Sequence, residues 1–267
     1  MVSNSIGQHL EKVRQINPLI HHITNYVSVN DCANIALQLG ALPVMADAVE
    51  EVEEMVSLAG ALVLNIGTLN KRIVDSMLKA AKKANELSIP VILDPVGCGA
   101  TSYRTQTTLR LLEEVRVTVL KGNAGEIGTI AGLEAEVRGV ESGNVTGDLV
   151  QAGQKLAARL GAVVVVTGAT DLILSPSGAA TVSNGHPFLG RITGTGCMAA
   201  TAVAAFSAVA EDAFAASVSA LACFGVAAEL AAYSNPSGPL SFKTAFLDAI
   251  AALQPDQVTN LAKIAYI

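Results

Sequence analysis

Short aliphatic runs alternate with helical patterns through the middle of the chain. Four runs place apolar residues at consecutive positions, the pattern of strands buried on both faces; they occupy 61–67, 91–95, 117–120 and 163–166. Between the first two, residues 71–87 repeat apolar side chains at helical spacing, with lysines on the opposite face. A further helix is predicted over about 106–114. This alternation predicts a parallel sheet with helices covering both of its faces.

The rhythm changes after Asp171. Residues 172–174 and 181–182, separated by Pro176-Ser177-Gly178, predict an antiparallel hairpin at an edge of the sheet. From Thr195 onward the pattern is helical throughout. No linker, low-complexity segment or repeat interrupts the sequence, so we expect a single α/β domain over residues 1–267.

The composition is apolar, yet it predicts no membrane span. Apolar residues make up 51% of the chain and charged residues 15%, against about 25% charged in a typical soluble domain. The most apolar stretches, 198–210 and 214–228, fall short of the roughly 20 residues that cross a bilayer, so we interpret them as buried core helices. Residues 1–10 are polar, and we expect no secretory signal there.

The net charge and the cysteine content limit the classes of partner and the cellular compartment that we expect for the protein. The net charge of −6 includes no basic block, which argues against nucleic acid and membranes as partners. The four cysteines, Cys32, Cys98, Cys197 and Cys223, show neither C-x-x-C spacing nor histidines at metal-binding spacing. Neither a zinc site nor a disulfide framework is therefore indicated, and we expect a cytoplasmic protein.

Small and polar residues follow each of the four predicted strands. Ligands bind beyond the carboxyl ends of strands in a parallel sheet, so we expect these residues to meet at one edge. They are Asn65-Ile66-Gly67-Thr68, Asp94 to Gly99, Lys121-Gly122-Asn123 with Glu126, and Thr167-Gly168. Their chemistry suits a site for phosphate and metal. Two simpler interpretations stay open, namely Asp94 as a turn residue and Asn123 with Glu126 as a helix capping box.

The most distinctive local motif is Thr193-Gly194-Thr195-Gly196-Cys197-Met198, which immediately precedes an Ala-rich helix. A Gly-rich turn entering a helix presents free backbone N–H groups and the positive end of the helix dipole, which predicts an anion site. The alternative is that Thr195 simply caps the helix. A P-loop is excluded because no Lys follows Gly196. The motif also fits the Gly-x-Gly-x-x-Ala spacing of dinucleotide-binding folds. A dinucleotide-binding site is nevertheless rejected, because no aliphatic strand leads into the turn.

His21 and His22 are adjacent. On a strand they would point to opposite faces and could not bind one metal ion together. We therefore expect one of them to be structural.

Several of these motifs resemble the ribokinase-like kinases, through Gly194 to Cys197 at the start of a late helix and Asn123-x-x-Glu126 after a middle strand. Within that superfamily the chain is similar to the hydroxyethylthiazole kinases over nearly its whole length, less so after about Asn235. The motifs that carry this resemblance are His22-x-Thr24-Asn25, Ala33-Asn34, Pro43-x-Met45-Ala46, Asn65-Ile66-Gly67-Thr68, Ile92 to Gly97 and Gly122-Asn123.

The resemblance implies a three-layer ribokinase-like fold, with a mostly parallel central sheet and helices on both faces. It implies transfer of the γ-phosphoryl group of ATP to the hydroxyethyl group of 4-methyl-5-(2-hydroxyethyl)thiazole, a step of thiamine salvage. The residues that it assigns are Lys121, Thr167 and Gly168 for ATP, Met45, Gly194, Asn25 and Val27 for the thiazole alcohol, and Asp94 and Glu126 for Mg²⁺. Lys121 is a departure, since the family commonly has Arg there and lysine lacks a bidentate fork.

The turn formed by Gly194, Thr195, Gly196 and Cys197 is expected to face the transferred phosphoryl group, because this reaction depends on positioning and charge stabilisation. Most relatives place Asp where Cys197 stands, as the base for the acceptor hydroxyl. We hypothesise that Cys197 acts as a weak base, because a helix N-terminus is expected to lower the pKa of its thiol. Met45 is expected to form an apolar wall for the acceptor, the alternative being plain core packing.

Three alternatives remain open. A hydroxymethylpyrimidine kinase has the same fold and a different alcohol as acceptor, although those kinases open with a Gly-rich, Asp-containing block that this chain lacks. An ATP-dependent hydrated-NAD(P) dehydratase also shares the fold, but such enzymes usually have Asp at the position of Cys197. A non-catalytic nucleotide sensor would bind ATP without turnover.

The charge-poor composition also bears on assembly. Extensive exposed apolar area generally marks an interface. The family resemblance implies a homotrimer with active sites where subunits meet. We expect the segment 25–45 to lie against the site of a neighbouring subunit.

Overall fold

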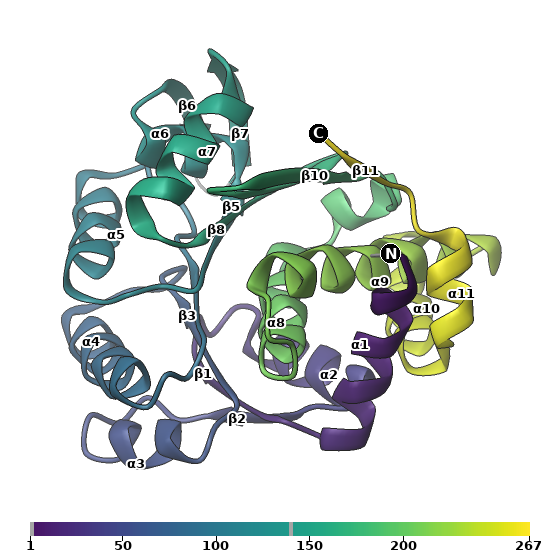
Figure 1. The fold of residues 1–267 in the computed structure, drawn as a ribbon, viewed down its shortest axis with the longest axis horizontal. Helices are drawn as coiled ribbons and strands as arrows, with labels where there is room; N and C mark the ends of the chain where they lie inside the picture. The colour runs from purple at the N-terminus through teal and green to yellow at the C-terminus, as the bar shows by residue number, and fades with distance from the viewer. Residues whose placement is uncertain (1–2, 139–140) are drawn as a thin grey trace.

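The computed structural model describes residues 3–138 and 141–267 and has a nine-stranded sheet at its centre (Figure 1). Its strand order is β11-β10-β9-β8-β5-β4-β3-β1-β2. These strands are β1 (Leu19–Ile23), β2 (Leu42–Met45), β3 (Ala61–Asn65), β4 (Val91–Asp94), β5 (Val119–Asn123), β8 (Val163–Thr167), β9 (Asp171–Ser175), β10 (Gly178–Val182) and β11 (Ile264–Tyr266). A separate antiparallel pair consists of β6 (Glu134–Arg138) and β7 (Glu141–Thr146).

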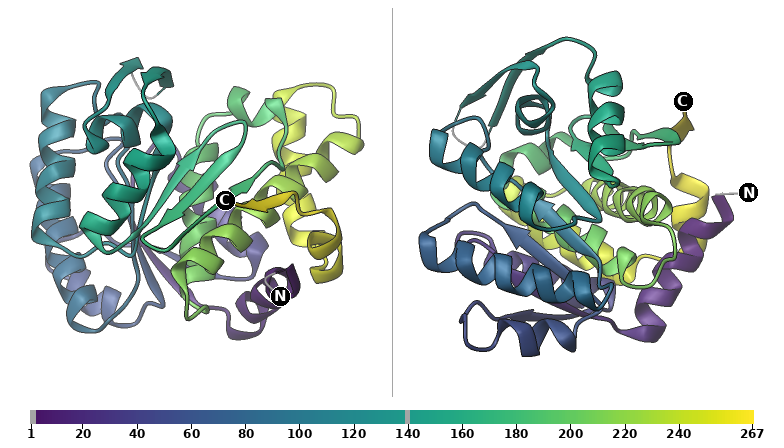
Figure 2. Two further views of the ribbon diagram at one scale, coloured as in Figure 1. Left: turned by 45° about the horizontal axis from the view of Figure 1, so that its top comes forward. Right: turned by 60° about the vertical axis from the view of Figure 1, so that its left-hand side comes forward.

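Helices cover both faces of the sheet (Figures 1 and 2). One layer contains α3 (Val52–Ser57), α4 (Lys71–Glu86), α5 (Ser102–Glu114), α6 (Ala124–Ala131) and α7 (Leu149–Leu160). The other contains α1 (Ser3–Ile16), α2 (Val29–Leu39), α8 (Thr195–Ser207), α9 (Ala213–Tyr233), α10 (Pro239–Ala252) and α11 (Pro255–Leu261). A short 3₁₀ helix, Pro187–Arg191, leads into the turn before α8.

Neighbouring residues of one strand feed two different apolar cores. In β4, Ile92 belongs to the core under α8 and α9, whereas Leu93 belongs to the core under α4 and α5. Val119 and Leu120 of β5 divide in the same way. Because side chains alternate across a strand, a strand buried on both faces needs apolar residues at every position. The predicted parallel sheet, running from β2 to β8, is confirmed.

The predicted hairpin is also confirmed, since β9 and β10 pair antiparallel. Two expectations about this end of the chain are wrong. The hairpin does not form the edge of the sheet, because β11 pairs antiparallel with β10 outside it. The region after Thr195 is therefore not entirely helical. A strand of three residues is too short to produce a recognisable hydrophobic period.

The helix predicted from residue 106 begins at Ser102 instead. Thr101 caps it, with its side chain accepting a hydrogen bond from the backbone N–H of Arg104. The first turn is polar, so apolar periodicity could not reveal it. This earlier start brings Arg104 onto the helix.

The two apolar stretches form core helices, as predicted. Within the described residues, α9 is the one helix whose 21-residue length and composition would suit a membrane span. However, 72% of its most apolar window is buried inside the protein. The helix is longer than the predicted apolar stretch 214–228. It packs against α1, α8 and α10. Its apolar surface therefore serves the core.

The adjacent histidines of β1 serve opposite faces, as expected. His21 Nε2 lies 2.7 Å from the carbonyl oxygen of Ala46, beyond β2. His22 Nε2 lies 3.1 Å from the hydroxyl oxygen of Thr201 on α8. Both rings are buried, and burial lowers the pKa of His22 to about 4. His22 is therefore a neutral link between the sheet and the helix that follows the Gly-rich turn.

Acidification is predicted to weaken the fold through His22. Between pH 6.5 and about 4 the unfolded chain binds a proton at this ring and the folded chain does not, so stability falls as pH falls. A shift of this size corresponds to about 3 kcal/mol. We expect His22→Gln to reduce the loss of unfolding free energy between about pH 7 and about pH 4.5, measured by urea denaturation. His186→Gln is the matched control, and an unchanged loss in His22→Gln would contradict this role.

Candidate active site

The carboxyl ends of four neighbouring parallel strands place their polar residues side by side. Asn65 of β3 pairs in register with Asp94 of β4. Asn123 of β5 pairs in register with Thr167 of β8. The first turn of α8 lies over the same edge, because a Cβ atom added to Gly196 would be 3.2 Å from Lys121 Nζ. Residues far apart in sequence thus form one polar site.

Asp94 is the buried acidic group of this site, with 1% of its surface exposed. Its Oδ2 accepts a hydrogen bond of 2.7 Å from the Asn65 amide. Its Oδ1 lies 3.5 Å from Lys121 Nζ and accepts no hydrogen bond from the described residues. Burial raises the pKa of Asp94, although the Lys121 ammonium and the Asn65 amide oppose the rise. One carboxylate oxygen is thus left for a further donor or cation.

Lys121 supplies a fixed positive charge beside Asp94. It is buried, which would lower the pKa of its amine, but the carboxylates of Asp94 and Glu126 outweigh this effect and raise it. The amine therefore stays protonated, pressed against Gly196 of the turn. Lysine here provides a point charge rather than the fork that Arg would offer.

Glu126 forms the capping box that the sequence left as an alternative. Its Oε2 accepts a hydrogen bond from the backbone N–H of Asn123, and its own N–H donates to Asn123 Oδ1. Its Oε1 accepts a 2.8 Å hydrogen bond from the N–H of Gly97. Burial raises the pKa of Glu126 to about 7, and the charge of Asp94 adds to the rise. Glu126 therefore ties α6 to the loop after β4.

The Gly-rich turn has a free helix end. Gly194, at φ +91°, is the residue before the helix, and no side chain caps it. The interpretation of Thr195 as a cap is wrong, because its hydroxyl lies within hydrogen-bonding distance of the carbonyl oxygens of Leu189 and Ile192. The first backbone N–H groups of α8 are thus left without a side-chain acceptor, which suits an anion.

Cys197 faces this centre with its sulfur held by two amides. The Nδ2 groups of Asn25 and Asn65 lie 3.3 Å and 3.2 Å from its Sγ. The expected lowering of its pKa is wrong. Burial raises the pKa of Cys197, and the charge of Asp94 adds to the rise, against the hydroxyl of Ser28, the ammonium of Lys121 and the amide of Asn25. The helix end alone was a poor guide because the sequence did not reveal how deeply the thiol lies.

Of the remaining residues assigned by resemblance, Asn25 contacts this cluster directly, through the Cys197 sulfur. Asn25 is buried and also accepts hydrogen bonds from the N–H groups of Val27 and Ser28. Met45 is half-buried at the end of β2. The Thr167 hydroxyl donates to the carbonyl of Gly122. Val27 has 59% of its surface exposed and points away from the core, and Gly168 donates its N–H to Asp171.

Two contributors to the site were missed by sequence reasoning. Ser28 packs against the turn, with its Cβ 3.0 Å from the position of a Cβ at Gly194. Arg104 hydrogen-bonds to the loops that follow β3 and β4. Neither belongs to a strand end, to the Gly-rich motif or to the residues assigned by resemblance, which were the signals that found the others.

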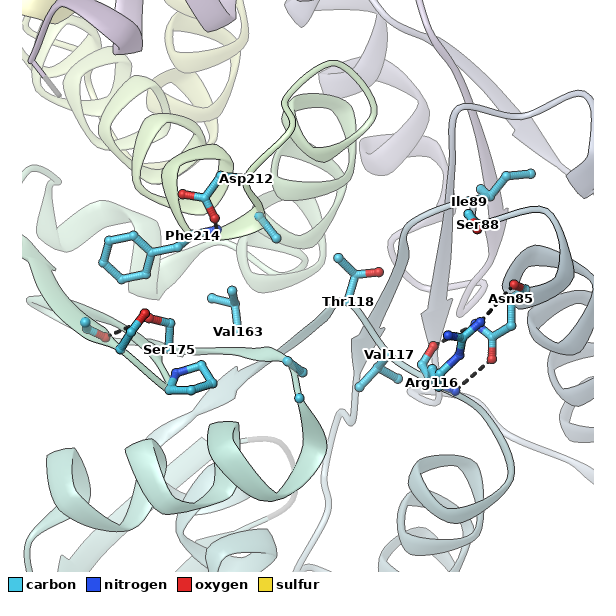
Figure 3. Close-up of a pocket in the computed structure, with 16 residues that line it drawn as sticks. Asn85, Ser88, Ile89, Arg116, Val117, Thr118, Val163, Ser175, Asp212 and Phe214 are labelled. Carbon is cyan, nitrogen blue, oxygen red and sulfur yellow. Dashed lines mark hydrogen bonds between the residues drawn. The ribbon is translucent and has the colours of Figure 1, made fainter.

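A groove of about 630 Å³ lies away from this cluster (Figure 3). Its lining includes Thr118 and Val163, at the starting ends of β5 and β8, together with Arg116 and Phe214. Asp94, Lys121 and Cys197 do not line it. The groove thus opens at the edge of the sheet opposite the polar site.

Comparisons with known proteins agree on one family. The family model described as the hydroxyethylthiazole kinase family matches residues 10–256. A hydroxyethylthiazole kinase of Methanocella arvoryzae is 53% identical over 266 residues, covering 100% of both chains.

Solved structures agree with the sequence comparison. The structure of a hydroxyethylthiazole kinase protein from Pyrococcus horikoshii OT3 matches with a TM-score of 0.90 and 41% identity, covering 98% of this chain and 99% of that one. A ribokinase-like superfamily protein from Enterococcus faecalis matches with a TM-score of 0.61 and 14% identity, covering 89% and 87%. That match supports the ribokinase-like fold alone.

The mostly parallel sheet, the polar cluster at its carboxyl edge and the uncapped turn before α8 are thus accompanied by sequence similarity over the whole chain. The chain belongs to the hydroxyethylthiazole kinase family and is a kinase of ribokinase-like fold.

Proposed function

We propose that this protein transfers the γ-phosphoryl group of ATP to the hydroxyethyl group of 4-methyl-5-(2-hydroxyethyl)thiazole, a step of thiamine salvage in the cytoplasm. Residues 1–267 act as one kinase domain. The observation that carries the proposal is the meeting of Asp94, Lys121 and the Cys197 sulfur at the uncapped start of α8. Family membership supports the choice of acceptor and of ATP.

The Gly194–Cys197 turn acts as the anion hole in this proposal. Phosphoryl transfer has a loose transition state, and catalysis rests on positioning and charge stabilisation. The Lys121 ammonium lies beside the backbone N–H groups at the start of α8. Both would bind the oxygens of the transferred group while attacking and leaving oxygens lie in line.

The residues present fit a hydrated Mg²⁺. Among residues 3–138 and 141–267, no cluster of three or more His, Cys, Asp or Glu side chains could hold a metal. Mg²⁺ needs no such cage, since it keeps waters and takes one or two carboxylates plus substrate phosphates. Asp94 Oδ1, without a hydrogen-bond donor, suits this role, and Glu126, whose oxygens already hold backbone N–H groups, suits contact through water. The cation would neutralise charge on the phosphate oxygens.

Substrates are assigned to the two sides of the cluster. Thr167 and Gly168, at the end of β8, with Lys121 on the neighbouring strand, are proposed to bind ATP. Met45, Val27, Asn25 and Gly194 are proposed to bind the thiazole alcohol, with Met45 as an adaptable apolar wall. The small, neutral acceptor calls for apolar walls rather than a cluster of arginines.

Cys197 is proposed as the base for the acceptor hydroxyl. In a loose transition state little proton removal is needed early, so a weak base suffices. Its raised pKa keeps the thiolate scarce, while the amides of Asn25 and Asn65 orient the sulfur as an acceptor. The hydroxyl proton would pass to the thiolate form of this sulfur, which ends as a neutral thiol, while the new O–P bond forms and the bond from phosphorus to ADP breaks.

We further propose a homotrimer whose active sites lie between subunits. Strand β2 is an edge of the sheet, and Leu42 on it is 49% exposed. Tyr26, Val27 and Leu37 nearby in sequence are 77%, 59% and 51% exposed. Edge strands and apolar groups of this kind are normally covered. A neighbouring subunit against segment 25–45 would cover them beside the site.

An ADP-release assay tests the function. With ATP and Mg²⁺, we expect ADP formation to require the thiazole alcohol and to stop when EDTA removes the metal. Preference for a hydroxymethylpyrimidine acceptor, or dehydration of hydrated NAD(P)H, would assign the protein to a rival class. ATP binding without ADP formation in the presence of the alcohol would identify a nucleotide sensor.

The Cys197→Ala variant belongs in the same assay: loss of a general base should lower kcat by about 10²-fold or more, and a change within about twofold would exclude that role.

Light scattering tests the assembly. We expect three chains per particle for the wild type. Leu42→Asp places a charge on the proposed interface and should shift the mass towards one chain, whereas Leu87→Asp, at an exposed leucine after α4, should not. A monomeric wild type would contradict the trimer.

A further inference from the structure

Arg104 is an arginine whose charge has no carboxylate partner. Arg72 and Arg110 form ion pairs with Asp47 and Glu114, but no ion pair involves Arg104 within the part of the chain that the structure describes. It also lies in the first turn of α5, where the helix dipole disfavours a positive charge. The place on the helix, rather than the missing ion pair, sets Arg104 apart, because Arg14 also donates to three backbone carbonyls.

The guanidinium of Arg104 instead donates hydrogen bonds to three backbone carbonyls. Nη1 donates to the oxygens of Val96 at 2.6 Å and Ile66 at 3.0 Å, and Nη2 donates to that of Gly67 at 2.8 Å. Val96 belongs to the loop after β4, and the other two belong to the loop after β3. One side chain from a third element therefore fastens the two loops to each other.

The peptide between Val96 and Gly97 is held at both ends. Its oxygen accepts from Arg104, and its N–H donates to Glu126 Oε1 at 2.8 Å. Gly97 adopts φ +77°, which favours glycine. A cation from α5 and a carboxyl group from α6 thus fix the orientation of one peptide plane, three residues beyond Asp94.

These two loops follow directly from the residues that face the reaction. Asn65 precedes Ile66 and Gly67, and its Nδ2 reaches both Asp94 Oδ2 and Cys197 Sγ. Its Oδ1 accepts from the N–H of Gly67, inside the segment that Arg104 holds. A shift of the loop after β3 would therefore turn the Asn65 amide, and with it the hydrogen bonds of that amide to Asp94 and to the Cys197 sulfur.

We propose that Arg104 is a positioning residue for phosphoryl transfer, which locks the loops after β3 and β4 at the spacing that Asn65, Asp94 and Cys197 require. This inference rests on the proposed kinase function. Misplacement by about 1 Å can cost about 10²-fold in rate. Arg104 touches none of the residues proposed to bind ATP or the alcohol, such as Thr167 or Met45. Its loss should therefore lower kcat and spare both KM values.

A guanidinium is needed for this task. Three carbonyl oxygens are reached by two nitrogens of one planar group. An ammonium is a compact point charge on a flexible stem and cannot reproduce that fork. Lysine at position 104 would keep the positive charge, but it should therefore not restore kcat.

The test compares Arg104→Lys and Arg104→Met with Arg110→Met, an exposed arginine of the same helix. We expect kcat to fall about 10-fold to 10²-fold in both Arg104 variants, with each KM within about threefold, and no such change in Arg110→Met. Unchanged kcat, full rescue by Lys, or a rise in KM with kcat intact would overturn the proposal.

Hydrogen exchange gives a second readout that needs no turnover. The amides of Gly67 and Gly97 should exchange about tenfold faster in Arg104→Lys, while those in the middle of β4 and β5 stay protected. Equal protection of Gly67 and Gly97 in variant and wild type would refute the lock. A wild type that forms no ADP with the thiazole alcohol would refute the proposed function instead, and the exchange experiment would still decide whether Arg104 locks the loops.

Discussion

The buried ion pair between Asp94 and Lys121 is the constraint on which the site depends. Removing a carboxylate and an ammonium from water costs several kcal/mol per ion, which is repaid only by good geometry and further hydrogen bonds. Here the Asn65 amide satisfies one carboxylate oxygen, while the ammonium lies against Gly196 in the first turn of α8. Placement of this pair fixes where the strand ends, the loops and the first turn of the helix must lie.

The surrounding residues are organised outward from that pair. Asn65 donates a hydrogen bond to the Cys197 sulfur, and Asn25 donates to the same sulfur from the segment after β1. Glu126 and Arg104 hold the loops from the two flanking helices. Asp94 Oδ1 is the exception in this network, because it is buried and accepts no hydrogen bond from the described residues. The satisfied members hold the active-site edge in place and leave that oxygen for a ligand.

The sequence predicted features that follow from the order of residues along the chain. It did not predict features that depend on the burial of a side chain or on contacts between residues far apart in sequence. The run 91–95 predicted a buried strand, and the strand-end rule then placed Asp94 and Lys121 together. Burial of Cys197 could not be read from a Gly-rich turn, so the direction of its pKa shift was wrong. Arg104 carried no signal because its partners are carbonyl oxygens, which every residue has. Strand β11 was missed because three residues form no period.

A double-mutant cycle on the unfolding free energy tests the central ion pair most directly. It compares Asp94→Asn, Lys121→Met and the double variant with the wild type by urea denaturation, without substrates. If the pair organises this edge, each single change leaves a buried polar group unpaired, at a cost of about 3–5 kcal/mol. The double variant should then cost clearly less than the sum of the two single changes. Costs that add within about 0.5 kcal/mol would mean that the two residues are independent, and would contradict the account.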